Sequence, residues 1–67
     1  MFDELETVAL TVDLPADRLS RGQVGTIVQV YAPDTFEVEF VDNDGRTYAV
    51  KTLTADQLLR LQFTAAA

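Results

Sequence analysis

The sequence predicts a small all-β domain, because one alternating stretch lies between two turn signals. Residues 35–41 alternate apolar and acidic side chains, the period-two pattern of a strand with one buried and one exposed face. The pair Pro33-Asp34 precedes this stretch, and Asp44-Gly45, a strong signal for a tight hairpin, follows it. The alternating residues are Phe36, Glu37, Val38, Glu39 and Phe40. The chain is therefore expected to be organised around a hairpin that ends with this strand.

The N-terminal part predicts a half-buried strand followed by a long loop. Residues 7–12 alternate in the same manner and are rich in β-branched side chains, which favour strands. In the loop of residues 13–20, Pro15 blocks continuation of the strand. Leu14 and Leu19 are expected to hold the two ends of this loop on the core. Loops of this kind often carry binding residues, because they vary without disturbing the fold.

Gly22 and Gly25 mark the entry into a second strand, residues 26–31. We expect at least one of these glycines to have a positive φ or to lie too close to neighbouring backbone for a Cβ. Both faces of the strand are partly apolar, as expected where a strand bends and serves two halves of a small barrel. Thr26, Val28 and Val30 are expected on one face, with Ile27, Gln29 and Tyr31 on the other.

The C-terminal third predicts a fourth strand, one helical turn and a short last strand. Residues 46–53 are expected to place Tyr48, Val50 and Thr52 on one face, opposite Thr47, Ala49 and Lys51. Thr54 and Gln57 have the spacing of a capping box, and the segment that follows is long enough for only one 3-10 or α turn. The last strand is expected at residues 61–63, and residues 64–67 as a disordered tail. Leu58, Leu59 and Leu61 are expected to pack over the open end of the sheet.

Together these elements predict one SH3-like small barrel over residues 1–67, with about five short strands and one helical turn before the last. An OB fold requires longer strands and a fuller helix in mid-chain, and a ferredoxin-like fold requires two helices. A chain of 67 residues without cysteine or histidine has no disulfide and no thiolate or imidazole metal ligand to support its core. A net stability of about 3–10 kcal/mol is expected for this length.

Composition also restricts location and chemistry. No apolar run approaches the ~20 residues of a membrane-spanning helix, and the acidic start lacks the basic and apolar regions of a signal peptide. The cytoplasm is therefore the expected location, without a membrane partner. Ser20 and the threonines have no histidine or cysteine beside them to form a nucleophile–base pair. No enzyme activity and no cofactor are predicted.

The net charge of −6, from 11 acidic and 5 basic side chains, disfavours nucleic acid as a partner, because phosphates are neutralised by Lys and Arg. An acidic surface promotes solubility, or it guides a partner protein with a basic surface to the binding site, and both interpretations stay open. Tyr31 contributes either to such a surface or to the rim of the core. The candidate partner-binding residues are Tyr31, Glu37, Glu39, Asp42 and Asp44.

Five segments occur in an order that points to a known family: Val8-Ala9-Leu10, Asp13-Leu14-Pro15, Gly22-Gln23-Val24-Gly25-Thr26-Ile27-Val28, Phe36-Glu37-Val38-Glu39-Phe40 and Asp44-Gly45. Together they resemble small bacterial proteins, common in cyanobacteria, known as domain of unknown function 4926. The resemblance implies an SH3-like small barrel with no established activity, cofactor or site residue. It also implies a context, since members look like the small partner in two-gene cassettes of the toxin–antitoxin or immunity type. A non-enzymatic, protein-binding role as an inhibitory or accessory partner is therefore expected, and self-association stays open.

A shorter stretch supports an alternative. Gly22-x-x-Gly25-Thr26-Ile27-Val28 resembles the KOW element of ribosomal and transcription proteins. This resemblance implies a nucleic-acid- or ribosome-associated module, for which Arg21, Arg46 and Lys51 would supply the positive charge.

Overall fold

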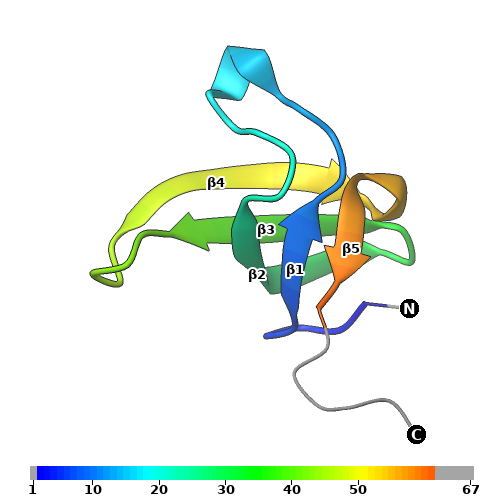
Figure 1. Cartoon of the computed structure of the whole chain (residues 1–67). Coiled ribbons are helices and arrows are strands. Elements are labelled where there is room, and N and C mark those ends of the chain that lie inside the picture. The colour runs from blue at the N-terminus through cyan, green and yellow to red at the C-terminus, as the bar shows by residue number, and fades with distance from the viewer. Residues whose placement is uncertain (1, 62–67) are drawn as a thin grey trace, which may run out of the picture.

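The computed structural model describes residues 2–61, which form one antiparallel sheet of five strands (Figure 1). The elements are β1 (Thr7–Leu10), the 3-10 turn η1 (Pro15–Asp17), β2 (Val24–Ala32), β3 (Thr35–Val41), β4 (Thr47–Thr54), the 3-10 turn η2 (Ala55–Gln57) and β5 (Leu58–Arg60). The order across the sheet is β4-β3-β2-β1-β5, so β4 and β5 are its two edges. The predicted all-β class, the five strands and the helical turn before the last strand are confirmed.

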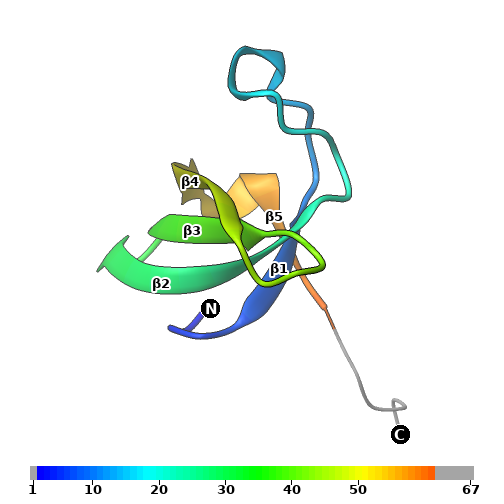
Figure 2. The same cartoon turned by 90° about the vertical axis from the view of Figure 1, so that its left-hand side faces the viewer.

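The three long strands β2, β3 and β4 lie side by side, and the shorter β1 and β5 are steeply inclined to them (Figure 1). The pairing of β2 with β3 shifts register between Ile27 and Gln29 and again between Val30 and Ala32. Such irregularities bend a strand and increase its twist, which lets a small sheet curl around its core. The expected faces of β2 were therefore wrong: Gln29 shares the outer face with Thr26, not a face with buried Ile27. The loop between β1 and β2 projects away from the sheet in both views (Figures 1 and 2). No helix among residues 2–61 has the length and apolar character needed to cross a bilayer.

The core lies on the inner face of the sheet and is centred on β3. Phe36, Val38 and Phe40 are completely buried there, whereas Glu37 and Glu39 between them are partly exposed. The predicted alternation of β3 is therefore confirmed, together with its bounds. The other buried apolar residues of this cluster are Val8, Leu10, Leu19, Ile27, Leu53 and Leu58.

Both glycines at the entry to β2 meet the expectation, each for a different reason. Gly22 has φ +92°, a conformation that side chains with a Cβ resist. An ideal Cβ on Gly25 would lie 2.7 Å from Val38 Cγ1 and 2.9 Å from the backbone oxygen of Glu39, so β2 and β3 approach too closely there for a side chain.

The first loop is attached to the body of the protein at both ends, as expected. Leu14 and Leu19 form an isolated antiparallel bridge, and Leu19 is buried in the core. Pro15 occupies the first position of η1, where its fixed φ and missing N–H are tolerated.

Three expectations for the C-terminal half were wrong. The last strand is Leu58–Arg60, directly after η2, and not residues 61–63. Leu58 is buried, but Leu59, on the opposite face of that strand, is 56% exposed, so Leu59 does not pack over the core as expected. The expected strand end at residues 62–63 and the expected tail at residues 64–67 lie outside the described residues. The third error is the face assigned to Tyr48.

Tyr48 leaves the alternation of β4 because the pairing with β3 shifts register between Phe40 and Val41. Its ring lies 6.3 Å from the ring of buried Phe40, and its hydroxyl accepts a hydrogen bond from Gln23 Nε2 at 3.0 Å. Tyr48 therefore covers one edge of the core instead of sharing the outer face with Val50 and Thr52.

Candidate functional site

The acidic residues of β3 lie on the outer face of a central strand. Glu37 is opposite Gln29 of β2 and Thr52 of β4. Glu39 is opposite Thr26 and Val50 in the same two strands. Since β3 is paired on both sides, its carboxylates do not protect a free sheet edge from aggregation. The residues opposite them in both strands are uncharged.

Tyr31 extends this outer surface at the end of β2. Its hydroxyl donates a hydrogen bond to Glu37 Oε1 at 2.6 Å, and half of the side chain is exposed. This bond raises the pKa of the Tyr31 hydroxyl, because ionisation would remove the donor and place a second negative charge beside the carboxylate. Two of the predicted site residues are therefore in direct contact.

Glu37→Gln is expected to lower the pKa of Tyr31 toward its ordinary value, because the charged acceptor is removed. Titration of tyrosinate absorbance measures this, with Tyr31→Phe identifying the contribution of Tyr31. An unchanged Tyr31 titration in Glu37→Gln would show that the bond to Glu37 does not form in solution.

Asp42 and Asp44 lie in the turn between β3 and β4, and they differ in role. Asp42 Oδ1 accepts the backbone N–H groups of Asp44 at 2.9 Å and Arg46 at 3.0 Å, so this carboxylate stabilises the turn. Gly45 supplies the positive φ, +79°, that the turn requires. Asp44 is exposed at the tip. At about 3.3 Å per residue, this turn begins roughly 16 Å along the strand from Glu37, so the acidic surface is elongated rather than clustered.

The three basic residues expected for the nucleic-acid-associated alternative lie on three different parts of the fold. Lys51 forms an ion pair with Asp17 of the first loop, with a distance of 3.1 Å between Nζ and Oδ2. Arg21 lies in the return of that loop, where its backbone N–H donates to Asp13 Oδ1 at 2.9 Å. Arg46 belongs to the β3–β4 turn. Lys51 is thus partly neutralised within the fold.

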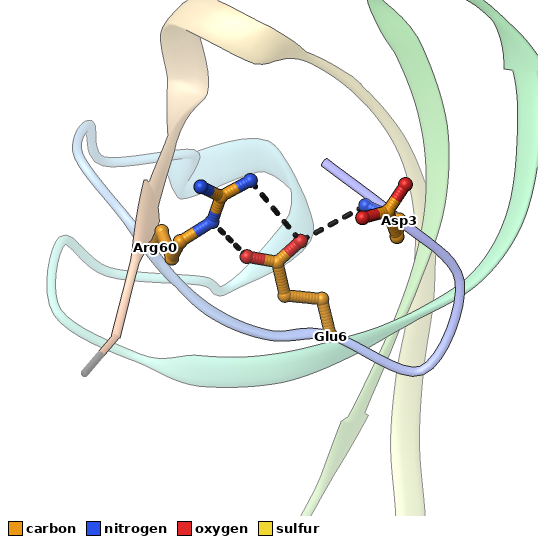
Figure 3. Close-up of polar contacts among 3 residues, drawn as sticks. All are labelled: Asp3, Glu6 and Arg60. Carbon is orange, nitrogen blue, oxygen red and sulfur yellow. Dashed lines mark hydrogen bonds and ion pairs between the residues drawn. The ribbon is translucent and has the colours of Figure 1, made fainter. Parts of the chain in front are cut away.

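A charged cluster that the sequence did not indicate joins the N-terminal segment to β5 (Figure 3). Glu6 accepts the backbone N–H of Asp3 at 2.9 Å and binds the Arg60 guanidinium. Arg60 lies 5.4 Å above the centre of the Phe2 ring, and Phe2 packs edge-on against Phe36. Because Glu6 and Arg60 are 54 positions apart, only the pairing of β1 with β5 brings them together.

The N–H of Asp3 lowers the pKa of Glu6; burial opposes this in part, and Arg60 adds to the lowering. A carboxyl group with a lowered folded-state pKa stabilises the protein above its unfolded pKa, about 4.3 for Glu, and loses that contribution as the pH falls through the folded value. The stability difference between wild type and Glu6→Gln is therefore expected to shrink as the pH falls from about 7 to about 2.

Urea denaturation at several pH values measures this difference. The matched control is Glu4→Gln, because Glu4 is exposed in the same segment. A difference for Glu6→Gln that stays constant over this range would mean that the ionised carboxylate does not stabilise the fold.

The described residues contain neither a pocket nor a group of three acidic, histidine or cysteine side chains arranged to hold a metal ion. What they offer is an exposed surface: the outer face of β3 with Glu37 and Glu39, bordered by Tyr31 at one end and Asp44 at the other. Such a surface binds macromolecules through complementary charge and shape.

Comparison with known proteins gives a family but no activity. The family model described as Domain of unknown function (DUF4926) matches residues 4–60. No curated protein and no solved structure matches the chain. The family match covers all five strands and the whole of the acidic surface. The chain therefore belongs to the family of the domain of unknown function 4926.

Proposed function

We propose that this protein is a non-enzymatic binding module that docks another protein on the acidic outer face of β3. In this proposal it is a cytoplasmic protein and the small inhibitory or accessory member of a two-gene pair. The partner carries a basic surface. The observation that carries the proposal is the position of Glu37 and Glu39, which form no ion pair within residues 2–61 although they lie on a central strand.

The contrast with other carboxylates supports this proposal. Glu6 and Asp17 are each paired with a cation of the fold, and Asp42 is used by its own turn. Glu37 is oriented by the Tyr31 hydroxyl but keeps its charge uncompensated. A basic partner relieves the repulsion between neighbouring carboxylates and is guided to them by the net charge of −6.

The proposal is tested by capture of partners from an extract of cells that naturally produce the protein. The double charge reversal Glu37→Lys with Asp44→Lys is expected to leave the fold intact and to abolish the capture of proteins that wild type retains. The matched control is Asp3→Lys with Glu4→Lys, which changes the net charge equally at two exposed positions outside the acidic surface. Equal capture by wild type and by the Glu37/Asp44 variant would exclude this face.

The alternative function, a nucleic-acid- or ribosome-associated role, requires the protein to bind phosphates. Binding of wild type to DNA or RNA at physiological salt is expected to be undetectable, because the acidic excess opposes the approach of phosphates. Micromolar binding, lost on replacing Arg21 and Arg46, would instead support the nucleic-acid-associated role.

A further inference from the structure

β4 is the longer of the two edge strands of the sheet. β4 has eight residues and pairs with β3 alone among the strands of residues 2–61. The other edge strand, β5, has only three residues. Long edge strands present a row of unpaired backbone donors and acceptors, which favours pairing with another strand. β4 contains no proline, and five of its eight residues are threonine, valine or tyrosine, which favour strands.

The hydrogen bonds at the end of β4 identify the residues that face this edge. The N–H of Ala55 donates to the backbone oxygen of Asp34, on the β3 side, whereas the N–H of Thr54 is directed away from β3 and donates to Gln57 Oε1. Successive residues of a strand direct their backbone groups to opposite sides. Thr54 directs its N–H outward, so the backbone groups of Thr52 and Val50, two and four residues earlier, also face outward. The backbone groups of Leu53 and Lys51 face β3.

The residues that face this edge are adjacent to the acidic surface. Thr52 is directly opposite Glu37, and Val50 is directly opposite Glu39. Both of these β4 side chains are short and exposed, so they do not screen the carboxylates from a strand added beyond them. Lys51, the cation of β4, is directed to the other face, where it binds Asp17.

From this juxtaposition we infer that β4 accepts an extended segment of the partner protein, with Lys or Arg at alternate positions. This inference rests on the proposed function and names how the partner docks. Residues of an added strand lie two strand spacings, about 9.6 Å, from β3. The four-carbon stem of Lys spans the short β4 side chains, so that its ammonium group approaches a Glu carboxylate. Glu37 and Glu39 repeat every second residue, which is the spacing of cations along one face of a strand.

Charge selects this partner over a second copy of the same chain. Pairing β4 with β4 of another copy would bring two surfaces with Glu37 and Glu39 together, and each copy carries a net charge of −6. The basic strand gains both backbone hydrogen bonds at Val50 and Thr52 and attraction to the carboxylates.

The probe for this inference is the synthetic peptide acetyl-Thr-Lys-Val-Lys-Val-Lys-Thr-amide, titrated into the full-length protein and followed by NMR. The amide protons of Val50 and Thr52 are expected to exchange about fivefold more slowly in the bound state, because they become hydrogen-bonded. The same peptide N-methylated along its central residues is expected not to bind, and this control leaves the protein itself unchanged.

Two protein variants test separately how the β4 edge and the two carboxylates contribute to peptide binding. Val50→Pro removes an outward N–H without removing a bond to β3, and Glu37→Gln with Glu39→Gln removes the two charges. Each is expected to weaken peptide binding about tenfold, with the fold verified by its NMR spectrum. A dimer formed by the free protein and lost in Val50→Pro would overturn the inference in favour of self-pairing.

The remaining outcomes distinguish the two proposals. Binding that depends on the carboxylates but tolerates Val50→Pro and N-methylation overturns strand addition and leaves the proposed function standing, with the partner docked on the face of the sheet. Peptide binding that is lost in Val50→Pro but unchanged in Glu37→Gln with Glu39→Gln would overturn the role of the two carboxylates instead. Absence of binding at millimolar peptide concentrations overturns strand addition by a basic segment.

Discussion

Replacing Phe40 with alanine is expected to lower the free energy of unfolding by about 3–5 kcal/mol. Phe40 is completely buried on the inner face of β3, where it packs beside Gly25 and the Tyr48 ring. Removing it leaves a cavity between Gly25 of β2 and Tyr48 of β4, which a small core cannot fill by collapse. A domain of this size has roughly 3–10 kcal/mol of stability in total, so the variant is expected to be largely unfolded at moderate urea concentrations.

The matched control is Glu39→Ala, one position earlier on the same strand but on the outer face. Its effect on the free energy of unfolding is expected to stay within about 0.5 kcal/mol, since no core contact is lost. Urea denaturation followed by circular dichroism measures both. Equal stability of the two variants would contradict the register of β3 and with it the division into an inner core and an outer binding face.

Gly25→Ala is expected to be the most damaging of the glycine substitutions. The added Cβ would lie 2.7 Å from Val38 Cγ1 and 2.9 Å from the backbone oxygen of Glu39. The side chain of Val38 is held in a packed core, and the oxygen belongs to the strand paired with β2. Relief therefore requires β2 and β3 to separate, and overpacking of this kind costs about 1–3 kcal/mol or more.

Gly22→Ala is the appropriate comparison, because the cost there has a different origin. Gly22 has φ +92° and no atom within 4 Å of an added Cβ, so only backbone strain of about 1–2 kcal/mol is expected. Thermal and urea unfolding of the two variants should rank Gly25→Ala below Gly22→Ala. The reverse order would mean that β2 and β3 are farther apart at this point than described.

Much of this fold was predictable because local signals agree with the long-range structure. The bounds of β3 follow from strict alternation between two turn signals, and η2 follows from the spacing of Thr54 and Gln57, whose side chain accepts the Thr54 N–H at 2.9 Å. The last strand was misplaced because its apolar residues are consecutive, so the sequence does not show where η2 ends and β5 begins.

Contacts that depend on register or on sheet order were not predictable. Tyr48 covers the core because of a register shift between β3 and β4, for which the sequence of β4 contains no signal. The pairing of Glu6 with Arg60 requires β5 to lie beside β1, a long-range feature of the sheet.

The candidate site was predictable in part for the same reason. Alternation alone places Glu37 and Glu39 on one face of β3. The hydrogen bond between Tyr31 and Glu37, in contrast, follows a register shift between Val30 and Ala32 that no residue pattern marks. The identity of a partner depends on a second molecule, so the chain alone supplies only the chemistry of the surface that would meet it.

The most direct measurement of the central proposal is the association rate of the captured partner as a function of ionic strength, by stopped-flow mixing. For wild type the rate is expected to fall steeply as ionic strength rises from about 0.05 M to about 0.5 M, because salt screens attraction between surface charges. For Glu37→Lys with Asp44→Lys, association is expected to be slow at every ionic strength and to lose that steep fall. Equal rates with the same salt dependence in the two proteins would contradict docking on the acidic face of β3.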